Sequence, residues 1–302
     1  MLMKLGIISP SAPYKGRPSR EENFAPALKT LERLGLETLE GTHCSENSGF
    51  IASSALNRAT DINDFYKDNT IQGLIATSGG WNAGEVLEHL DFTAIENNQK
   101  PIIGFSDISV LQNGVFAKTG CQHLHAPLLC VGLTAPDKVT TTSLQKALSK
   151  EPQEFPISEF GNVLQPGEAE GTILGGNIIT LETLLGTSYE PNWEGAVIFI
   201  EEVGEKLFRL LRALNHFKMA GVWDKASAIV IGTMEDCDGT FEGTEQDIFE
   251  AIRSFFSFFK GPIIRTDLFG HHIVGGEGSH ISIPIGGIAK IDTSNGITLS
   301  FS

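Results

Sequence analysis

A serine stands where an apolar stretch of the chain turns into a helical pattern. Residues 101–105 are mostly apolar, Gly104 precedes the serine by two positions, and apolar residues recur at spacings of three and four from Ile108 onward. A strand that turns sharply into a helix lifts the side chain at the turn away from the backbone and aims the first amides of the helix at the same place. Ser106 could therefore attack a carbonyl carbon while the amide of Asp107 holds the oxyanion. A serine at this place could equally be only the cap of the helix.

Two further stretches carry side chains that could assist such a serine. The apolar residues 197–200 end abruptly in the carboxylates of Glu201 and Glu202, and the imidazoles of His271 and His272 follow a glycine. A serine hydroxyl is a weak nucleophile until an imidazole takes its proton, and a carboxylate fixes the tautomer of that imidazole. Taken alone, the acids could serve only to solvate a strand end, and the histidines could belong to a solvated loop. Together with the serine, the three groups supply the parts of a Ser-Glu-His triad.

The segments that must position these residues alternate between strand and helix patterns. Short apolar runs such as residues 5–9 and 73–77 are typical of buried strands, and stripes of helical spacing lie between them. This alternation predicts βαβ units and a parallel sheet, in which sites form at the carboxyl ends of the strands. The Gly79-Gly80 loop and the Ser106 turn both follow such strands, so we expect them to share one crevice.

The first predicted helix carries a start signal and an internal proline. Ser19 and Glu22 match a capping box, and a leucine stripe runs on to Gly35, which is well placed to end the helix. Pro26 lies inside this stretch. We therefore expect the helix either to kink or to start later than the capping box suggests.

The chain divides at a stretch of weaker periodicity. Between residues 132 and 171 the strand and helix patterns fade into prolines and polar residues. We predict an N-terminal domain over residues 1–150, which carries the nucleophile, and a linker over residues 151–170. Residues 171–302 are predicted to form a C-terminal mixed α/β domain that carries both partners of the serine. Catalysis would then depend on how the two domains are docked.

Composition and charge exclude several classes of partner. The chain has 302 residues and a formal net charge of −15, which would repel nucleic acid and anionic membranes. No stretch approaches the ~20 apolar residues of a membrane span, and the first residues run directly into a predicted strand rather than a secretory signal. The four cysteines are scattered, which is typical of free thiols in a reducing cytoplasm. We therefore expect a cytoplasmic protein, for which small or peptide substrates stay open.

One cluster of residues contains side chains that could bind zinc. Cys121, His123 and His125 alternate, so a strand would point all three the same way. A fourth ligand with the usual spacing is missing. We expect neither a metal nor a cofactor.

Three segments resemble the catalytic blocks of the LD-carboxypeptidase family, in the order in which the family has them. They are Gly104-Phe105-Ser106-Asp107, Phe199-Ile200-Glu201-Glu202-Val203-Gly204-Glu205 and Phe269-Gly270-His271. Further matches are Gly79-Gly80, His125-Ala126-Pro127, Gly175-Gly176-Asn177, Leu185-Gly186-Thr187 and Ile283-Pro284-Ile285-Gly286. The family consists of serine peptidases with a Ser-Glu-His triad and includes the microcin C immunity peptidases. Because the resemblance spans nearly the whole chain, the chain is identified as a member of this family.

The resemblance implies a role for each catalytic residue. Ser106 would be the nucleophile, His271 the general acid and base, and Glu201 the carboxylate that orients the imidazole. The amides of Asp107 and Gly80 would form the oxyanion hole.

The same resemblance implies a fold and an assembly. It implies an α/β protein with a flavodoxin-like parallel-sheet domain at the N-terminus, a smaller mixed α/β domain at the C-terminus and the site between them. Members of the family are commonly dimers, so a homodimer is expected.

The loop around Gly79 departs from the carboxypeptidase pattern. LD-carboxypeptidases usually have an arginine before the Gly-Gly pair, whereas here Ser78 precedes it and Trp81-Asn82 follows. This loop resembles the immunity branch, while residues 202–205 resemble the carboxypeptidase branch. We expect Gly79, Trp81 and Asn82 to contact the substrate, although the indole could equally pack in the core.

These features favour a serine carboxypeptidase that hydrolyses the bond before the C-terminal D-amino acid of a murein tetrapeptide. The alternative within the family is a microcin C immunity-type peptidase that cleaves peptidyl or aminoacyl nucleotides. A third hypothesis, from another class, is a non-catalytic protein that holds a small peptide in the crevice.

Overall fold

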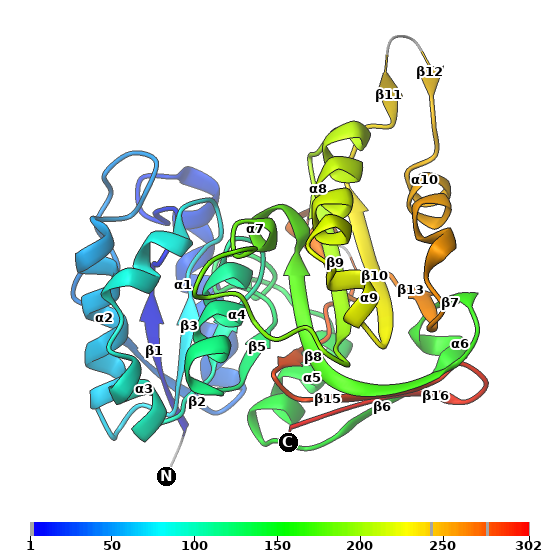
Figure 1. The fold of residues 1–302 in the computed structure, drawn as a ribbon. Coiled ribbons are helices and arrows are strands. Elements are labelled where there is room, and N and C mark those ends of the chain that lie inside the picture. The colour runs from blue at the N-terminus through cyan, green and yellow to red at the C-terminus, as the bar shows by residue number, and fades with distance from the viewer. Residues whose placement is uncertain (1–2, 242–243, 276–277, 302) are drawn as a thin grey trace.

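Two β-sheets lie side by side in the computed structural model, which describes residues 3–241, 244–275 and 278–301 (Figure 1). The first sheet contains, in order across it, β2 (Leu36–Glu40), β1 (Met3–Ile8), β3 (Gly73–Ala76), β4 (Ile102–Gly104), β5 (His123–His125) and β14 (Ile283–Ile285). Its strands are parallel except for β14, which pairs antiparallel with β5. The order β2-β1-β3-β4-β5 is that of flavodoxin-like doubly wound sheets.

The second sheet is mixed. It contains, in order across it, β6 (Gln153–Pro156), β16 (Gly296–Ser300), β15 (Ile288–Asp292), β8 (Glu168–Asn177), β9 (Val197–Val203), β10 (Ala228–Glu235), β13 (Ile263–Arg265) and β7 (Asn162–Gln165). The strands from β8 to β13 are parallel, and those at either side are antiparallel. A short hairpin of β11 (Thr240–Phe241) and β12 (Thr244–Glu245) projects from the molecule (Figure 1). The predicted α/β class with a parallel-strand sheet and a second mixed sheet is confirmed.

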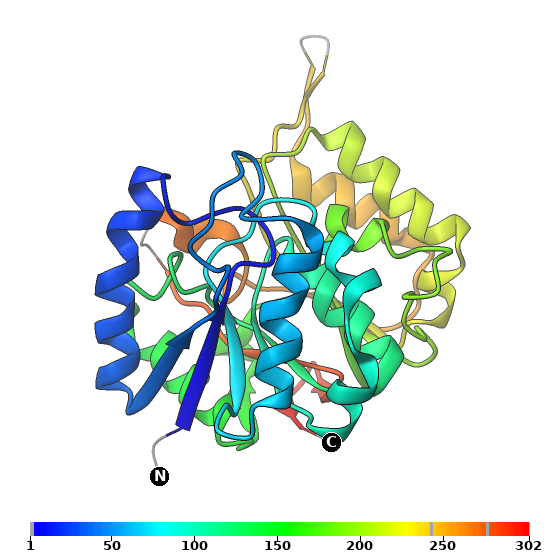
Figure 2. The ribbon, with the colours of Figure 1, turned by 90° about the vertical axis from the view of Figure 1, so that its left-hand side faces the viewer.

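Helices surround the two sheets, as the two perpendicular views show (Figure 1, Figure 2). The α-helices are α1 (Pro18–Arg33), α2 (Ala55–Lys67), α3 (Phe92–Asn97), α4 (Ile108–Thr119), α5 (Lys138–Leu148), α6 (Ile157–Phe160), α7 (Ile178–Glu182), α8 (Leu207–Met219), α9 (Val222–Lys225) and α10 (Ile248–Phe255). Three 3-10 helices are η1 (Ala83–His89), η2 (Phe256–Phe258) and η3 (His271–Gly275). No helix in the described part of the chain combines the length and the apolar character that a membrane span needs.

The first sheet is buried on both faces. Side chains alternate along each strand, so each strand contributes residues to two different cores. Ile7, Ile75 and Ile103 belong to a core shared with α1 and α5. Leu74 and Ile102 belong to a second core, shared with α2, α4 and the strands of the second sheet. Since α4 also contacts β8 and α7, it is one of the elements that join the nucleophile-bearing half to the other half.

The residues predicted to form a linker contain strands of the second sheet. Residues 151–170, predicted to be a linker, form β6 and β7, which pair with β16 and β13 of the second sheet. These strands are short and lie at sheet edges, so they contain too few apolar residues to show a strand pattern. In the other direction, β14 joins the first sheet, with Ile283 opposite His125. The predicted linker is therefore part of the second sheet, and one strand from the predicted C-terminal domain belongs to the first sheet.

The predicted start of the first helix is wrong. α1 begins at Pro18, its N-cap is Arg17, and the cap makes no side-chain hydrogen bond. Proline suits the first helical position because no amide donor is needed there. Ser19 therefore lies inside the helix rather than at its cap, and the helix continues past Pro26 to Arg33.

Candidate active site

Ser106 occupies the turn between β4 and α4 in a strained backbone conformation. Its φ is +64°, in the left-handed region that residues with a side chain rarely adopt. This conformation costs on the order of 1–2 kcal/mol for a non-glycine residue, and such strain is concentrated at functional sites. The N-cap residue of α4 is Asp107, so Ser106 stands outside the helix and does not cap it.

Three side chains from separate elements meet at this turn. The Nε2 atom of His271 lies 2.9 Å from the Oγ atom of Ser106, and its Nδ1 atom lies 2.6 Å from the Oε2 atom of Glu201. His271 begins η3, and Glu201 lies in β9, where it is fully buried. A carboxylate can only accept, so Nδ1 carries the proton and Nε2 is free to accept one from the serine. The ring of Phe105 packs edge-on against the imidazole, with centroids 4.8 Å apart.

The surroundings of His271 favour its protonated form. Burial lowers the pKa of this imidazole, but the charge of Glu201 and its hydrogen bond raise it, and the net pKa lies above the usual 6.5. An imidazole that becomes more basic when it is paired with a buried carboxylate suits proton transfer from a hydroxyl.

The neighbouring acid and imidazole face elsewhere. Glu202 accepts hydrogen bonds from the Nδ2 atom of Asn177 at 2.8 Å and from the amide of Ile179 at 3.1 Å, so it ties β9 to the start of α7. Burial, followed by the charge of Glu201, raises the pKa of Glu202 to about 7. The Nε2 atom of His272 lies 2.8 Å from the carbonyl oxygen of Ser279. Of each adjacent pair, only the first member lies in the relay.

The glycine loop after β3 lies close to the serine hydroxyl. A Cβ atom added to Gly79 would lie 2.9 Å from the Oγ atom of Ser106, so the loop after β3 touches the nucleophile turn. The amides of Gly80 and Asp107 donate to no other described residue. The carboxylate of Asp107 turns away from the hydroxyl and accepts hydrogen bonds from the amide of Ala83, at 2.9 Å, and from a serine hydroxyl. That the amides of Gly80 and Asp107 form an oxyanion hole stays a prediction.

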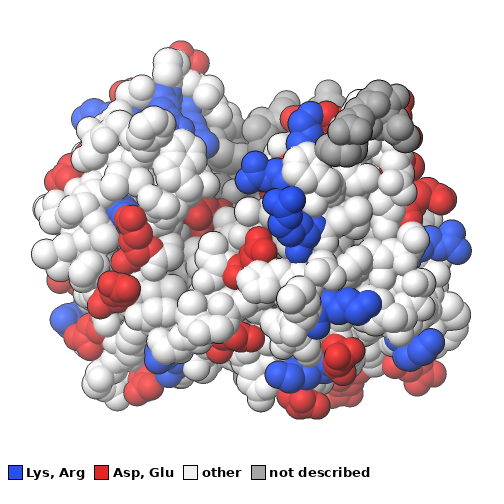
Figure 3. Space-filling model, turned by 45° about the horizontal axis from the view of Figure 1, so that its top comes forward, with Lys and Arg blue, Asp and Glu red and all other residues white. Residues whose placement is uncertain are grey.

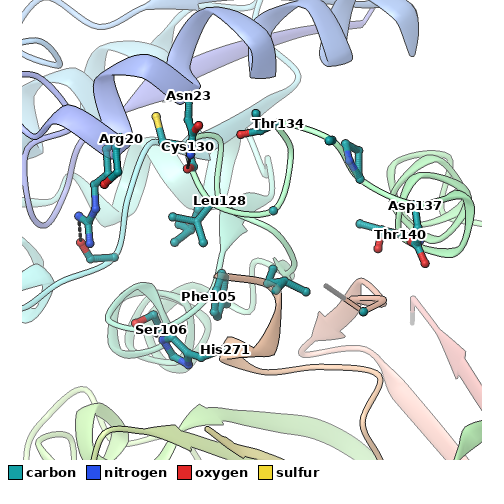
Figure 4. Close-up of a pocket in the computed structure, with 18 of the residues that line it drawn as sticks. Arg20, Asn23, Phe105, Ser106, Leu128, Cys130, Thr134, Asp137, Thr140 and His271 are labelled. Carbon is teal, nitrogen blue, oxygen red and sulfur yellow. Dashed lines mark hydrogen bonds between the residues drawn. The ribbon is translucent and has the colours of Figure 1, made fainter. Parts of the chain in front are cut away.

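A cavity of about 560 Å³ opens above the relay. Ser106 and His271 lie on one side of it, and the opposite side comes from α1 and from residues 130–140 (Figure 4). Gly79 and Gly80 line the cavity, whereas Trp81 and Asn82 do not.

The two residues after the glycine pair face outward. The Trp81 side chain is 41% exposed, and its indole packs against Phe50 with ring centroids 5.6 Å apart. Asn82 adopts a left-handed conformation with φ of +69°, and its carbonyl accepts a hydrogen bond from Arg58. The indole therefore stands at the rim of the site and not in the core.

Sequence reasoning missed the charged residues of the cavity. Among the described residues that line it, Arg20 is the only lysine or arginine, and Asp137 is the only acid. They come from the first turn of α1 and the N-cap of α5. No local motif marks either residue, because only the packing of distant segments places them here.

Two histidines of the alternating Cys121, His123 and His125 pattern are buried among other groups. The Nδ1 atom of His123 accepts from the amide of Ile102 at 3.1 Å, and burial lowers the pKa of His123 to about 3. His125 stacks on His280 with ring centroids 5.4 Å apart. Within the described residues there is no group of three His, Cys, Asp or Glu side chains that could hold a metal ion.

The acidic charge of the chain is unevenly distributed over its surface. The formal net charge is −15. The face seen in Figure 3 is nevertheless hollowed between the two halves, and Lys and Arg side chains flank the hollow on both sides.

Comparison with known proteins identifies the family. Residues 5–126 match the LD-carboxypeptidase N-terminal domain, and residues 170–291 match the LD-carboxypeptidase C-terminal domain. These two matches together cover most of the chain. The chain belongs to the LD-carboxypeptidase family, as its resemblance in sequence predicted, and is thereby a peptidase.

Curated relatives come from both branches of this family. The chain is 27% identical over 295 residues to a Bacillus subtilis protein named "Probable murein peptide carboxypeptidase", covering 96% of this chain and 89% of the relative. It is 27% identical over 268 residues to the microcin C7 self-immunity protein MccF of Escherichia coli, covering 78% and 77% of the two chains. Among solved structures, an MccF-like protein from Bacillus anthracis is 28% identical with a TM-score of 0.86, over 99% of this chain and 97% of the other. Identity alone does not separate the two branches.

Proposed function

We propose that this protein is a serine carboxypeptidase that hydrolyses the bond before the C-terminal D-amino acid of a murein tetrapeptide. The observation that carries the proposal is the continuous chain of hydrogen bonds from Ser106 through His271 to the buried Glu201. A strained serine at the base of a cavity, an imidazole with its acceptor nitrogen toward that serine and a carboxylate behind the imidazole are the parts that acyl transfer requires. The family and its murein-named relative support the substrate class.

The first half of the proposed reaction forms an acyl-enzyme. The Oγ atom of Ser106 attacks the carbonyl carbon of the scissile bond while Nε2 of His271 takes its proton. The oxyanion accepts hydrogen bonds from the amides of Asp107 and Gly80. When the C–N bond breaks, the imidazolium returns the proton to the departing amine, and the C-terminal amino acid leaves with a free amino group.

The second half hydrolyses the ester. His271 takes a proton from a water molecule, whose oxygen attacks the acyl carbon. The bond between that carbon and Oγ breaks, and the proton passes from Nε2 to Ser106. Glu201 keeps the imidazole in one tautomer and stabilises its cation throughout, without itself becoming protonated.

Three residues of the glycine loop are proposed to contact the substrate. Gly79 lines the cavity beside the nucleophile, where its lack of a side chain leaves room for a peptide backbone. Trp81 and Asn82 stand outside the cavity, so we assign them to a part of the substrate that extends past the rim.

The second candidate is hydrolysis of a peptidyl or aminoacyl nucleotide of the microcin C type. The observation in its favour is the exposed pair of Phe50 and Trp81 at the rim, with the guanidinium of Arg17 5.6 Å from the indole centroid. Aromatic rings bind nucleobases by stacking, and a guanidinium suits a phosphate. The MccF relative carries the name of a microcin C7 self-immunity protein, which also supports this candidate.

Release of D-alanine distinguishes these candidates. Incubation with a murein tetrapeptide that ends in D-alanine is expected to give free D-alanine with the wild-type protein and none with Ser106→Ala. The same peptide ending in L-alanine serves as the stereochemical control. Cleavage of processed microcin C without any D-alanine release would overturn the carboxypeptidase proposal in favour of the second candidate.

The localisation, the oligomeric state and the domain division of the protein are also proposals. We propose a cytoplasmic homodimer, on the basis of the family resemblance and the four free cysteines. The division into residues 1–150 and 171–302 likewise stays a prediction. Light scattering on the purified protein tests the dimer, for which a mass near twice 32.6 kDa is expected.

A further inference from the structure

Arg20 carries a charge that the described residues leave unneutralised. Its side chain reaches from the first turn of α1 into the cavity, where its Nη1 atom donates to the carbonyl of Gly79 at 3.3 Å (Figure 4). None of the ion pairs among the described residues includes Arg20. A partly buried cation without an anionic partner is costly, so this position favours a ligand that brings a negative charge.

The other charge of the cavity does not compensate Arg20. Figure 4 shows Asp137 at the opposite end of the pocket, with Ser106 and His271 beside the space between them. The Asp137 carboxylate is already engaged, since it caps α5 through the amide of Thr140 at 2.8 Å. Among the described lining residues, the single guanidinium therefore lies on the side of the glycine loop and the single carboxylate at the other end.

Arg20 is also close to the reacting atoms. It holds the carbonyl of Gly79, and a Cβ atom on Gly79 would lie within 2.9 Å of the Oγ atom of Ser106. The α-carboxylate of a C-terminal residue is three bonds away from the scissile carbonyl carbon. A peptide placed for attack by Ser106 therefore brings this carboxylate near the guanidinium.

We propose that Arg20 binds the free α-carboxylate of the residue that is cleaved off, and that it thereby restricts the enzyme to the C-terminal bond of its substrate. The inference rests on the proposed carboxypeptidase function and deepens it. Arg20 forms charge-assisted hydrogen bonds with the carboxylate, and a substrate with an uncharged C-terminus leaves the guanidinium unpaired in the cavity.

Binding without turnover tests this role. The dissociation constant of Ser106→Ala is measured by calorimetry for a murein tetrapeptide with a free C-terminus and for the same peptide as its C-terminal amide. The acid is expected to bind about 10- to 100-fold more tightly than the amide. Arg20→Gln in the Ser106→Ala background is expected to bring this ratio to about one.

Arg33→Gln is the matched control. Arg33 belongs to the same helix as Arg20 and loses the same charge in this variant, but it lies in the last turn of α1, donates to the Oγ1 atom of Thr30 at 2.8 Å and does not line the cavity. Its acid-to-amide ratio is expected to equal that of the parent. Should Arg20→Gln not fold, Arg20→Lys carries the test, because lysine keeps the charge but loses the forked geometry and is expected to lower the ratio.

Different results would overturn the role of Arg20 and the proposed carboxypeptidase function. A ratio near one in Ser106→Ala, no binding of either peptide, or a ratio that Arg20→Gln and Arg20→Lys leave unchanged would overturn the role of Arg20. Absence of D-alanine release by the wild-type protein would instead overturn the proposed function. An acid-to-amide ratio that depends on Arg20 would still support the inference in that case.

Discussion

At the scale of the residue, the backbone of Ser106 is as informative as its hydroxyl. Its φ of +64° is a conformation that glycine adopts without cost and that other residues adopt only when their surroundings enforce it. The hydrogen bond to His271 and the contact with the Gly79 loop give a reason for this strain, because both depend on where the turn holds the Oγ atom.

Two substitutions separate the strain from the chemistry. Ser106→Gly and Ser106→Ala both remove the hydroxyl and are both expected to abolish D-alanine release. Glycine relieves a strain of about 1–2 kcal/mol and loses about 0.5–1 kcal/mol through its unfolded-state entropy. Ser106→Gly is thus expected to unfold in urea with a free energy up to about 1.5 kcal/mol above that of Ser106→Ala. An alanine variant that is more stable than the glycine variant would show that the turn stores no such strain.

The pH dependence of activity belongs to His271. The imidazole must be neutral to accept the serine proton, so kcat/KM falls as the pH drops through the pKa of His271, which Glu201 raises above 6.5. In Glu201→Gln the anion is lost while burial remains, so the acid limb of the profile is expected to move to lower pH. The maximal rate is expected to fall about a thousandfold or more, because the tautomer is no longer fixed.

His272→Gln is the control for that profile. His272 is the adjacent imidazole, but it faces the carbonyl of Ser279 and not the serine hydroxyl. Its removal is expected to leave the acid limb in place. An acid limb that moves in His272→Gln, or stays fixed in Glu201→Gln, would contradict the assignment of the pH dependence to His271.

At the scale of the element, the loop after β3 controls access to the nucleophile. A Cβ atom on Gly79 would lie 2.8 Å from the Cβ atom and 2.9 Å from the Oγ atom of Ser106, which is closer than such atoms approach. Gly79→Ala is therefore expected to displace the hydroxyl and to lower kcat/KM by about 100-fold, as displacements of about 1 Å commonly do. Steady-state kinetics on the tetrapeptide measures this loss.

Gly84→Ala provides the comparison within the same segment. Gly84 lies in η1, which follows the loop, and its added Cβ atom would meet Val110 at 3.6 Å, an ordinary van der Waals distance. This variant is expected to keep the wild-type kcat/KM. Equal activities of the two alanine variants would mean that the close approach of Gly79 has no role in catalysis.

Hydrophobic periodicity in the sequence correctly predicted several strands and a helix of the first half. The apolar runs around β3 and β4 and the stripe that begins at Ile108 all became buried elements, because alternation and helical periodicity express burial directly. The start of α1 was predicted incorrectly, because the pattern of Ser19 and Glu22 also occurs one position inside a helix that starts at a proline. The local sequence pattern does not distinguish a helix that is capped by Ser19 from one that begins at Pro18.

At the scale of the whole molecule, the two halves share one core. Buried residues from α2 and α4 are continuous with those of the second sheet, and β14 closes the first sheet with a strand from near the C-terminus. The relay itself spans both halves, since Ser106 belongs to the first and Glu201 and His271 to the second.

This shared core predicts that the chain unfolds as one unit. Trp193 and Trp223 are buried in the second half and dominate the change in fluorescence, whereas far-ultraviolet circular dichroism reports helices of both halves. In urea the two signals are expected to change together, with one midpoint. Two separate midpoints would show that the halves unfold independently and that the continuity of the core does not couple them.

The long-range features could not be predicted from the sequence. The pairing of β14 with β5 joins residues far apart in the chain, and no local pattern encodes which sheet a short strand joins. The same holds for Arg20 and Asp137, whose chemistry becomes visible only when the folds of α1 and α5 bring them to one cavity. The convergence of Ser106, Glu201 and His271 could be predicted only because the family resemblance implies a triad. Their spacing in the sequence does not show that they lie close together.

Labelling with a hydroxyl-directed fluorophosphonate tests the central claim most directly, because it asks whether the relay makes Ser106 a nucleophile. Mass spectrometry of the digested protein is expected to find the phosphonyl group on Ser106 of the wild-type chain and no label on Ser106→Ala. His271→Ala is expected to react at least about 100-fold more slowly. A wild-type protein that stays unlabelled, or that carries the label on another residue, would contradict the account and favour a protein that only binds its peptide.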